Sequence, residues 1–148
     1  MGFISDLQFG KKYEKESSKL LNYDRIEYAP NKKFYDYDIL IEKDGVTTKY
    51  EVKSDKLTHK TGNACIEYMC SGLDSGITMT KADYYMYFVI KPDESYDCYQ
   101  IPVDVIKKEI IGRRSMNGGD GWKAKFYLVP INVFEKYKFF IFRPDNCK

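Results

Sequence analysis

An aspartate, a glutamate and a lysine in the first half of the chain could together support metal-dependent chemistry. Asp38 opens an apolar run, and Glu51-Val52-Lys53 is the only triplet in which an acid stands two residues before a lysine. Two carboxylates suit a hard divalent cation such as Mg²⁺, which takes oxygen ligands and keeps several waters. A lysine beside them could orient or deprotonate a water, or stabilise charge that develops on a phosphate.

A β-hairpin over residues 34–53 is expected to position these three side chains. Apolar and polar residues alternate on both sides of an Asp-Gly pair, which is a strong signal for a hairpin turn. In the second strand, Tyr50 and Val52 point to one face, and Glu51 and Lys53 point to the other. If the apolar face packs on the core, the acid and the lysine emerge together beside the start of the first strand.

The acid-led strand followed by Glu-x-Lys resembles the core of the PD-(D/E)XK nuclease superfamily. The closest resemblance is to its small phage-type and Holliday-junction-resolvase-like members, and it extends from the first predicted helix to about Val89. The proline of the family name is absent, since Tyr37 precedes Asp38. The resemblance implies an α/β fold with a restriction-endonuclease-like mixed β-sheet flanked by helices.

The resemblance also implies a Mg²⁺- or Mn²⁺-dependent deoxyribonuclease in which Asp38, Glu51 and the Val52 carbonyl hold the metal. Lys53 would assist the attacking water, so that Asp38, Glu51 and Lys53 are the predicted catalytic residues. The substrate would be DNA, with branched or recombination DNA as a candidate, and a twofold homodimer would suit the cutting of junctions. The alternatives are a non-catalytic nucleic-acid-binding protein on the same fold, a structural or interaction protein, and a strand face that simply carries solvated charges.

The first predicted helix, residues 7–21, could supply a third metal-site acid. Glu14 and Glu16 lie at the two borders of its apolar stripe, so either could reach the hairpin. Glu14 is favoured because Gly10-x-x-x-Glu14 resembles the helix-one pattern of resolvase-like members. Asp36 lies on the same strand face as the first metal-site acid, and it could support that acid or bind a second ion.

Other charged residues are candidates for contacts around this site. The polar segment 54–62 is expected to be a loop, and 113–121 a flexible one that begins with basic residues. The candidate phosphate contacts in these two segments are Lys56, Lys60, Arg113 and Arg114. Glu67, in the short apolar segment 63–70, is a candidate for a polar residue that faces the metal, with a helix-surface carboxylate as the alternative.

The remaining segments complete an α/β pattern. Residues 22–33 predict an irregular link, and Thr80 is expected to cap a short helical turn. The other expected elements are a central strand at 84–90, a strand at 96–101, a helix at 102–111, a strand at 122–129, a short helix at 130–137 and a last strand at 138–143.

Length and composition bound the class of protein. The 148 residues have ordinary apolar content, so one nuclease-like domain spanning 1–148 is expected. No stretch is long and apolar enough for a membrane span, and no basic region followed by an apolar run opens the chain, so a cytoplasmic protein is expected rather than a secreted one. A net charge of +2 is weak support for nucleic-acid binding. The four cysteines lack zinc-ribbon spacing and there is a single histidine, so free thiols are expected.

Overall fold

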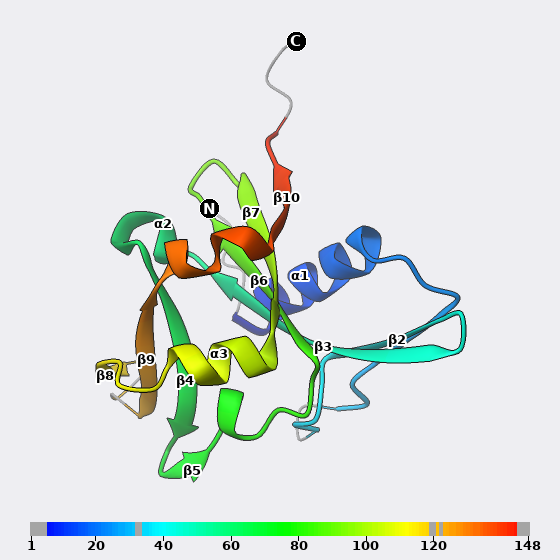
Figure 1. The fold of residues 1–148 in the computed structure, drawn as a ribbon. Coiled ribbons are helices and arrows are strands. Elements are labelled where there is room, and N and C mark those ends of the chain that lie inside the picture. Colours follow the sequence, from blue (N-terminus) through cyan, green and yellow to red (C-terminus); the bar gives the residue numbers. More distant parts are fainter. Residues whose placement is uncertain (1–5, 32–33, 119–120, 122, 145–148) are drawn as a thin grey trace.

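Two β-sheets form the framework of the computed structural model, which describes residues 6–31, 34–118, 121 and 123–144 (Figure 1). The larger sheet has six strands, in the spatial order β1 (Arg25–Tyr28), β2 (Ile39–Lys43), β3 (Val46–Asp55), β6 (Tyr84–Ile90), β7 (Tyr96–Pro102) and β10 (Lys138–Phe142). β3 and β6 run parallel and the other neighbours antiparallel, so this sheet is mixed. The smaller sheet is antiparallel, in the order β5 (Leu73–Asp74), β4 (Asn63–Cys70), β9 (Ala124–Pro130) and β8 (Ser115–Gly118).

The β2–β3 hairpin sets the register of the strands that carry the candidate site. Asp44 and Gly45 have φ values of 53° and 80°. Positive φ at both central residues is what a tight hairpin turn requires, because its twist then matches that of the flanking strands. The ladder runs from the Lys43–Val46 pair at the turn to Ile39 opposite Tyr50. The hairpin therefore brings the residue before Ile39 level with the middle of β3.

Helix α1 (Asp6–Leu20) covers one face of the large sheet. Its Tyr13 and Ser17 are buried, and the Ser17 hydroxyl donates a hydrogen bond of 2.9 Å to the Tyr13 carbonyl. The Tyr13 ring packs on Phe88 of β6, with ring centroids 5.0 Å apart. Tyr50 belongs to the same buried cluster. The Tyr50 face of β3 is therefore the face that packs against α1, as the strand alternation predicts.

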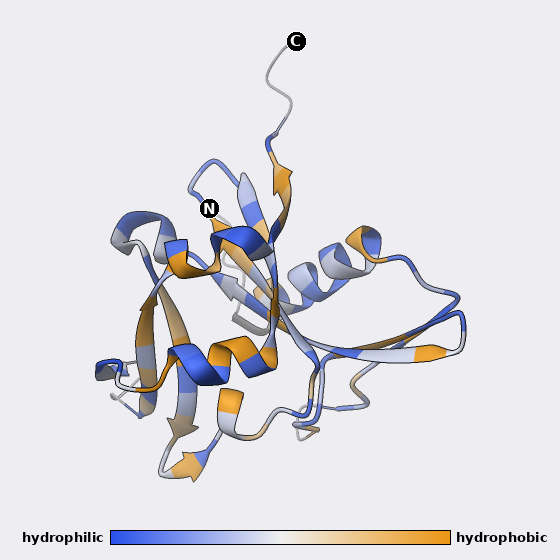
Figure 2. Ribbon diagram, viewed as in Figure 1, coloured by the Kyte–Doolittle hydropathy of each residue, from blue (hydrophilic) through white to orange (hydrophobic). Residues whose placement is uncertain are grey.

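A second core fills the space between the other face of the large sheet and the small sheet. Helix α3 (Val103–Glu109) and the 3₁₀ helix η3 (Ile131–Tyr137) close this core, and α3 alternates hydrophobic and hydrophilic residues along its length (Figure 2). Such alternation is expected of a helix with one buried side. Fully buried members of the core include Ile66, Tyr85, Ile101, Ile106, Val129 and Phe134.

The connection between the parallel strands β3 and β6 builds part of the small sheet. Parallel strands need a crossover, which is most often helical, but here it consists of α2 (Thr58–Thr61), β4, β5 and the 3₁₀ turn η1 (Gly76–Thr78). Asp55 fixes the start of the crossover, because its Oδ1 accepts hydrogen bonds from the amides of Leu57 and Thr58 at 2.7 and 2.9 Å. Its Oδ2 accepts a hydrogen bond from the Tyr87 hydroxyl of β6.

Most of the predicted elements are confirmed. The first helix, the hairpin and the strands expected at 84–90 and 96–101 are observed, as are the helix, strand, 3₁₀ helix and final strand that follow them. The strand expected at 122–129 appears as β9, while Trp122 lies outside the described residues. The chain is thus an α/β protein with a mixed sheet flanked by helices.

Four local predictions are wrong, because pairing with neighbouring strands and side-chain hydrogen bonds override the local signals. β1 forms within the expected irregular link 22–33 by pairing with β2, and β8 forms within 113–121 by pairing with β9. The expected loop 54–62 contains the end of β3 and the short helix α2. Thr80 does not begin a helix, because its hydroxyl is engaged by Glu51 and by the amide of Ala82, and the nearby helical turn is η1 instead.

Candidate active site

Asp38 is held at the point where the β2–β3 ladder ends. Its amide donates a hydrogen bond of 2.9 Å to the Tyr50 carbonyl, and its Oδ2 accepts one of 2.8 Å from the Val52 amide. The Asp38 side chain therefore takes the place of the next backbone hydrogen bond beyond the end of β2. The amide and carbonyl of an extended residue point to the same edge of its strand, so the Val52 carbonyl faces the Asp38 side of β3.

Glu51 and Lys53 lie together on the face of β3 that is turned away from α1. The Lys53 Nζ lies 3.5 Å from the Glu51 Oε2, and the Thr80 hydroxyl donates a hydrogen bond of 3.1 Å to the Glu51 Oε1. The Glu51 side chain is 14% exposed and the Lys53 side chain 34%. The ammonium group of Lys53 is thus in partial contact with solvent, whereas the carboxylate beside it is mostly enclosed.

Burial makes both carboxyl groups hard to ionise. It raises the pKa of Glu51 to about 7, with Lys53 acting in the opposite direction and the charge of Asp38 adding to the increase. Burial also raises the pKa of Asp38, against the opposing effects of the Val52 amide and Lys53. Two neighbouring carboxyl groups with raised pKa values favour a bound proton or a bound cation.

Of the two candidate acids on the first helix, Glu14 is the one near Asp38. Burial raises the pKa of Glu14 to about 7, and the charge of Asp38 is the next largest cause. Glu16 turns towards β7 instead, where it accepts a hydrogen bond of 2.9 Å from the Tyr96 hydroxyl and pairs with Lys19 at 3.2 Å. Glu14 is thus the helix acid that interacts with the charge of Asp38, while Glu16 is engaged by Tyr96.

Tyr85 is a member of this site that the sequence did not point to. It stands opposite Glu51 in the parallel β3–β6 register and is 1% exposed. Among the described residues its hydroxyl has no hydrogen-bond partner. Burial raises its pKa well above the ordinary value, and the charges of Glu51, Asp38 and Glu67 add to the effect. A neutral hydroxyl with no partner in the described part of the chain therefore lies among the carboxyl groups.

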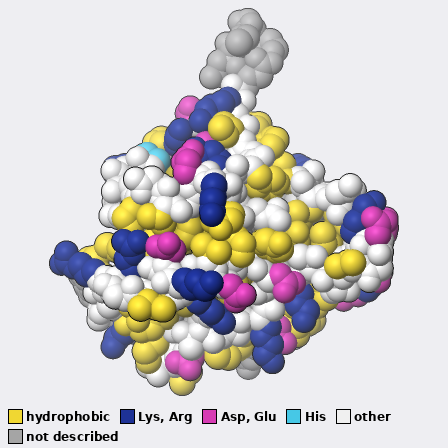
Figure 3. All heavy atoms as spheres, viewed as in Figure 1, with side chains coloured by type: hydrophobic (Ala, Val, Ile, Leu, Met, Phe, Trp, Pro, Cys, Tyr) yellow, Lys and Arg dark blue, Asp and Glu magenta, His cyan; other side chains and the backbone are white. Residues whose placement is uncertain are grey.

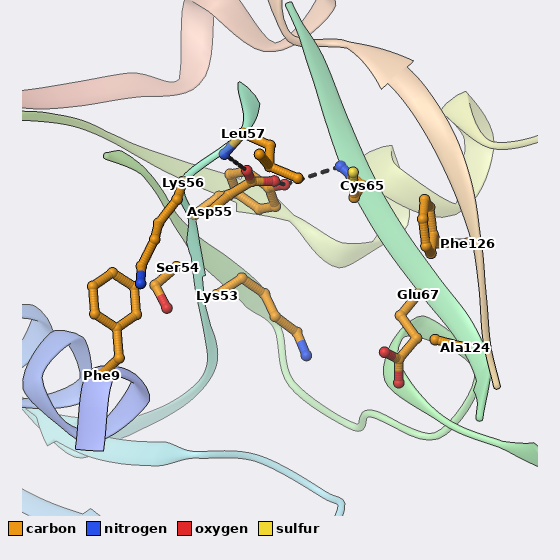
Figure 4. A pocket seen from close by; sticks show the side chains of 11 residues that line it. Phe9, Lys53, Ser54, Asp55, Lys56, Leu57, Cys65, Glu67, Ala124 and Phe126 are labelled. Carbon is orange, nitrogen blue, oxygen red and sulfur yellow. Dashed lines mark hydrogen bonds between the residues drawn. The ribbon is translucent and has the colours of Figure 1, made fainter. Parts of the chain in front are cut away.

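Glu67 faces the same region from the small sheet. It lies on strand β4, not on a helix, and its Oε2 accepts a hydrogen bond of 2.7 Å from the Ser75 hydroxyl. Gly76 allows this approach, because a Cβ there would lie 2.2 Å from the Glu67 carbonyl oxygen. Figure 4 shows Glu67 and Lys53 pointing towards each other across a cavity of about 650 Å³.

The predicted phosphate contacts are dispersed. Lys56 lines the cavity, with its Nζ 4.0 Å from the centroid of the Phe9 ring, and Lys60 is exposed on α2. Arg113 pairs with Glu109 at 2.9 Å, and Arg114 is exposed in the next position; neither arginine lines the cavity. On the face that carries α3, η3 and β10, lysines and arginines are interspersed with acids and hydrophobic groups (Figure 3).

Among the described residues, the backbone of Asp36, and not its side chain, is hydrogen-bonded to residues of the same site. Its carbonyl accepts hydrogen bonds from the Lys81 amide at 2.8 Å and from the Thr80 hydroxyl at 3.4 Å. Thr80 thus links the segment before Asp38 to Glu51. The Thr80 hydroxyl was not anticipated as part of the site, and only its position in the fold identifies it.

The donors available to a metal are oxygen atoms. Across the described parts of the chain, no group of three or more histidine, cysteine, aspartate and glutamate side chains is arranged to hold a metal ion. Cys65, Cys70 and Cys98 are free thiols, and Cys147 lies outside the described residues. Asp38 and Glu51 still fit the one or two carboxylates with which proteins usually hold Mg²⁺ while it keeps most of its waters.

Searches with family models, against curated proteins and against solved structures returned no significant match to this chain. Within the described residues, none of the helices has the length and apolar composition needed to cross a membrane. The functional assignment therefore depends on the site itself.

Proposed function

We propose that this protein is a Mg²⁺- or Mn²⁺-dependent nuclease that hydrolyses phosphodiester bonds of DNA on a restriction-endonuclease-like core. The observation that carries the proposal is the convergence of three residues: Asp38, hydrogen-bonded to the Val52 amide, and Glu51, 3.5 Å from the Lys53 ammonium. This combination of two enclosed carboxyl groups and one lysine is the arrangement that the PD-(D/E)XK resemblance implies.

Asp38, Glu51 and the Val52 carbonyl would hold the metal, with Glu14 as a further acid near Asp38. When bound, the metal would lower the pKa of a coordinated water and offset negative charge on the phosphate. The raised pKa values of the carboxyl groups support this role, because binding of a cation would release protons that the apo site retains at neutral pH.

Lys53 would position the attacking water and stabilise the pentavalent phosphorus. The attacking water loses one proton as its oxygen bonds to phosphorus, the bond between phosphorus and the leaving deoxyribose oxygen breaks, and that oxygen takes up a proton. The ammonium group suits the stabilising role because it is both near Glu51 and partly open to the cavity. A positive charge at this point acts where negative charge develops in the transition state.

The test is a cleavage assay with labelled linear, nicked and four-way-junction DNA, in Mg²⁺, in Mn²⁺ and in chelator. Wild type and Lys53→Ala are compared with Lys43→Ala, which removes an equivalent charge near the hairpin turn, where Lys43 pairs with Asp24 at 3.6 Å. We expect metal-dependent cutting by wild type and by Lys43→Ala and its loss in Lys53→Ala. DNA binding without cutting in either metal would refute the nuclease and favour a non-catalytic binding protein.

A further inference from the structure

The cavity beside Lys53 adjoins the carboxylate site and has aromatic as well as charged residues in its lining. Its volume is about 650 Å³, and α1, β3, β4, β6 and β9 all contribute to its lining. Figure 4 shows Phe9 on one side of it and Phe126 on the other, with Lys53 between them. The Lys53 side chain lines the cavity while its Nζ lies 3.5 Å from Glu51. Lys53 therefore connects the cavity to the proposed metal site.

Packing fixes both aromatic rings at the edges of this cavity. A Cβ at Gly118 of β8 would lie 2.6 Å from the Phe126 Cε1, so the Phe126 ring rests directly on that glycine and lines the cavity with its remaining surface. Phe9 packs on Tyr13, with ring centroids 5.1 Å apart, and the Lys56 Nζ lies 4.0 Å from the Phe9 centroid. Rings held in this way can receive a flat ligand with little loss of side-chain entropy.

Two aromatic walls with lysines at the rim match the chemistry of a nucleotide. A base has a flat face that stacks on aromatic side chains, and its phosphate is an anion that lysine can pair with. The cavity volume falls within the range of sites that enclose small ligands. Polar groups at the edge, Ser54 and Glu67, could bond to the rim of a base. A base inside a paired duplex cannot reach such a site unless it leaves the stack.

We propose that this cavity receives an unpaired nucleobase while Lys53 contacts the adjacent phosphate, so that the preferred substrate is single-stranded or locally unpaired DNA. The inference rests on the proposed function for the class of ligand, and it specifies the form of DNA that the site selects. Phe126 is the main stacking surface, and Phe9 with Lys56 forms the opposite wall.

Binding of a DNA strand that carries a central 2-aminopurine tests this proposal. The strand is used alone, in a fully paired duplex, and in a duplex where the probe lies in a three-nucleotide bulge, each in Ca²⁺ and in EDTA. Wild type is compared with Phe126→Leu and with Phe139→Leu, a matched control on β10 that is 42% exposed and outside the cavity. Phe9→Leu is the second cavity variant, used if Phe126→Leu lacks the wild-type circular dichroism spectrum.

We expect the single strand and the bulge to bind about tenfold or more tightly than the paired duplex, with quenched probe fluorescence. Because the variant loses an aromatic surface on which the base stacks, it should bind the unpaired probes about fivefold or more weakly and quench less, while Phe139→Leu behaves as wild type. Equal affinity for paired and unpaired DNA, or no effect of the cavity variants, would overturn the proposal.

Cleavage of the same substrates in Mg²⁺ separates this inference from the nuclease itself. Preference for unpaired DNA without any cutting would refute the nuclease and leave the cavity assignment standing. Cutting of the paired duplex as fast as the bulge, unchanged in Phe126→Leu, would support the nuclease and overturn the cavity assignment.

Discussion

Replacing Glu51 by glutamine should stabilise the metal-free protein at alkaline pH. The substitution keeps the size of the side chain and an acceptor for the Thr80 hydroxyl, but it removes a charge that burial disfavours. Glutamine thus mimics the protonated glutamate. The raised pKa means that the folded wild type gains protons relative to the unfolded chain, so its stability is greatest below the ordinary pKa of 4.5 and falls as pH rises towards about 7.

The size of this effect follows from the pKa of Glu51. Its pKa rises from 4.5 to about 7, and the side chain is only 14% exposed, so solvent screening is weak. Each pH unit is worth about 1.4 kcal/mol, and Glu51→Gln should therefore exceed wild type by about 3 kcal/mol at pH 8 and by almost nothing at pH 4. In a chain of this length the difference at pH 8 corresponds to about 6–12 °C in Tm.

The assay is urea unfolding in EDTA at pH 4, 6 and 8, followed by far-UV circular dichroism. Glu94→Gln is the matched control, because it makes the same chemical change at a side chain that is 76% exposed. Mg²⁺ should stabilise wild type by about 2.7 kcal/mol at a concentration 100 times the Kd, and it should not stabilise Glu51→Gln. The variant could instead have a lower free energy of unfolding than wild type at pH 8, or exceed wild type by the same amount at pH 4. Either result would refute the proposal that Glu51 is an enclosed carboxylate that binds a cation.

Three further substitutions test separate parts of the structure. Gly76→Ala should cost about 2–4 kcal/mol in urea unfolding, because the residue has a φ of 51° and the new Cβ would meet the Glu67 carbonyl at 2.2 Å. Tyr85→Phe removes a buried hydroxyl that has no hydrogen-bond partner among the described residues; we expect about 1–2 kcal/mol higher stability but cleavage about tenfold slower, and unchanged cleavage would exclude the hydroxyl from the reaction. Arg113→Ala should leave cleavage within about twofold of wild type, since Arg113 is paired with Glu109; a larger loss would restore it as a phosphate contact.

The hairpin and its side-chain orientation could be predicted because their causes are local. Alternation assigns Tyr50 to one face and Glu51 to the other, and the Asp-Gly turn sets the register. The choice between Glu14 and Glu16, in contrast, depends on a contact between residues far apart in the sequence. Both lie at a border of the helix stripe, and what separates them is a long-range hydrogen bond from Tyr96, eighty residues later in the chain. No local pattern contains that contact.

The small sheet could not be predicted because the pairing that joins its two halves, β4 with β9, is long-range. β4 pairs with β9, which begins more than fifty residues after β4 ends, and the apolar segment 63–70 is equally compatible with a short helix when read alone. β8 has only four residues, with a burial pattern that gives little signal. The polar content of 113–121 therefore indicated a loop, and pairing with β9 overrides that indication.

The small sheet and the crossover that builds it lie over the strand face that carries Glu51. A hairpin alone would leave Glu51 on an open strand face, where water keeps a carboxyl near its ordinary pKa. The crossover from β3 to β6 instead brings β4 over that face. Burial raises the pKa of Glu51, and the hydrogen bond from Thr80, at the end of the crossover, acts in the opposite direction. The same face of β4 forms a wall of the cavity next to Lys53. If the crossover creates both features, loosening it with Gly76→Ala should lower the pKa of Glu51 towards 4.5 and weaken binding of unpaired DNA in parallel. Loss of one property without the other would show that the carboxylate site and the cavity are independent.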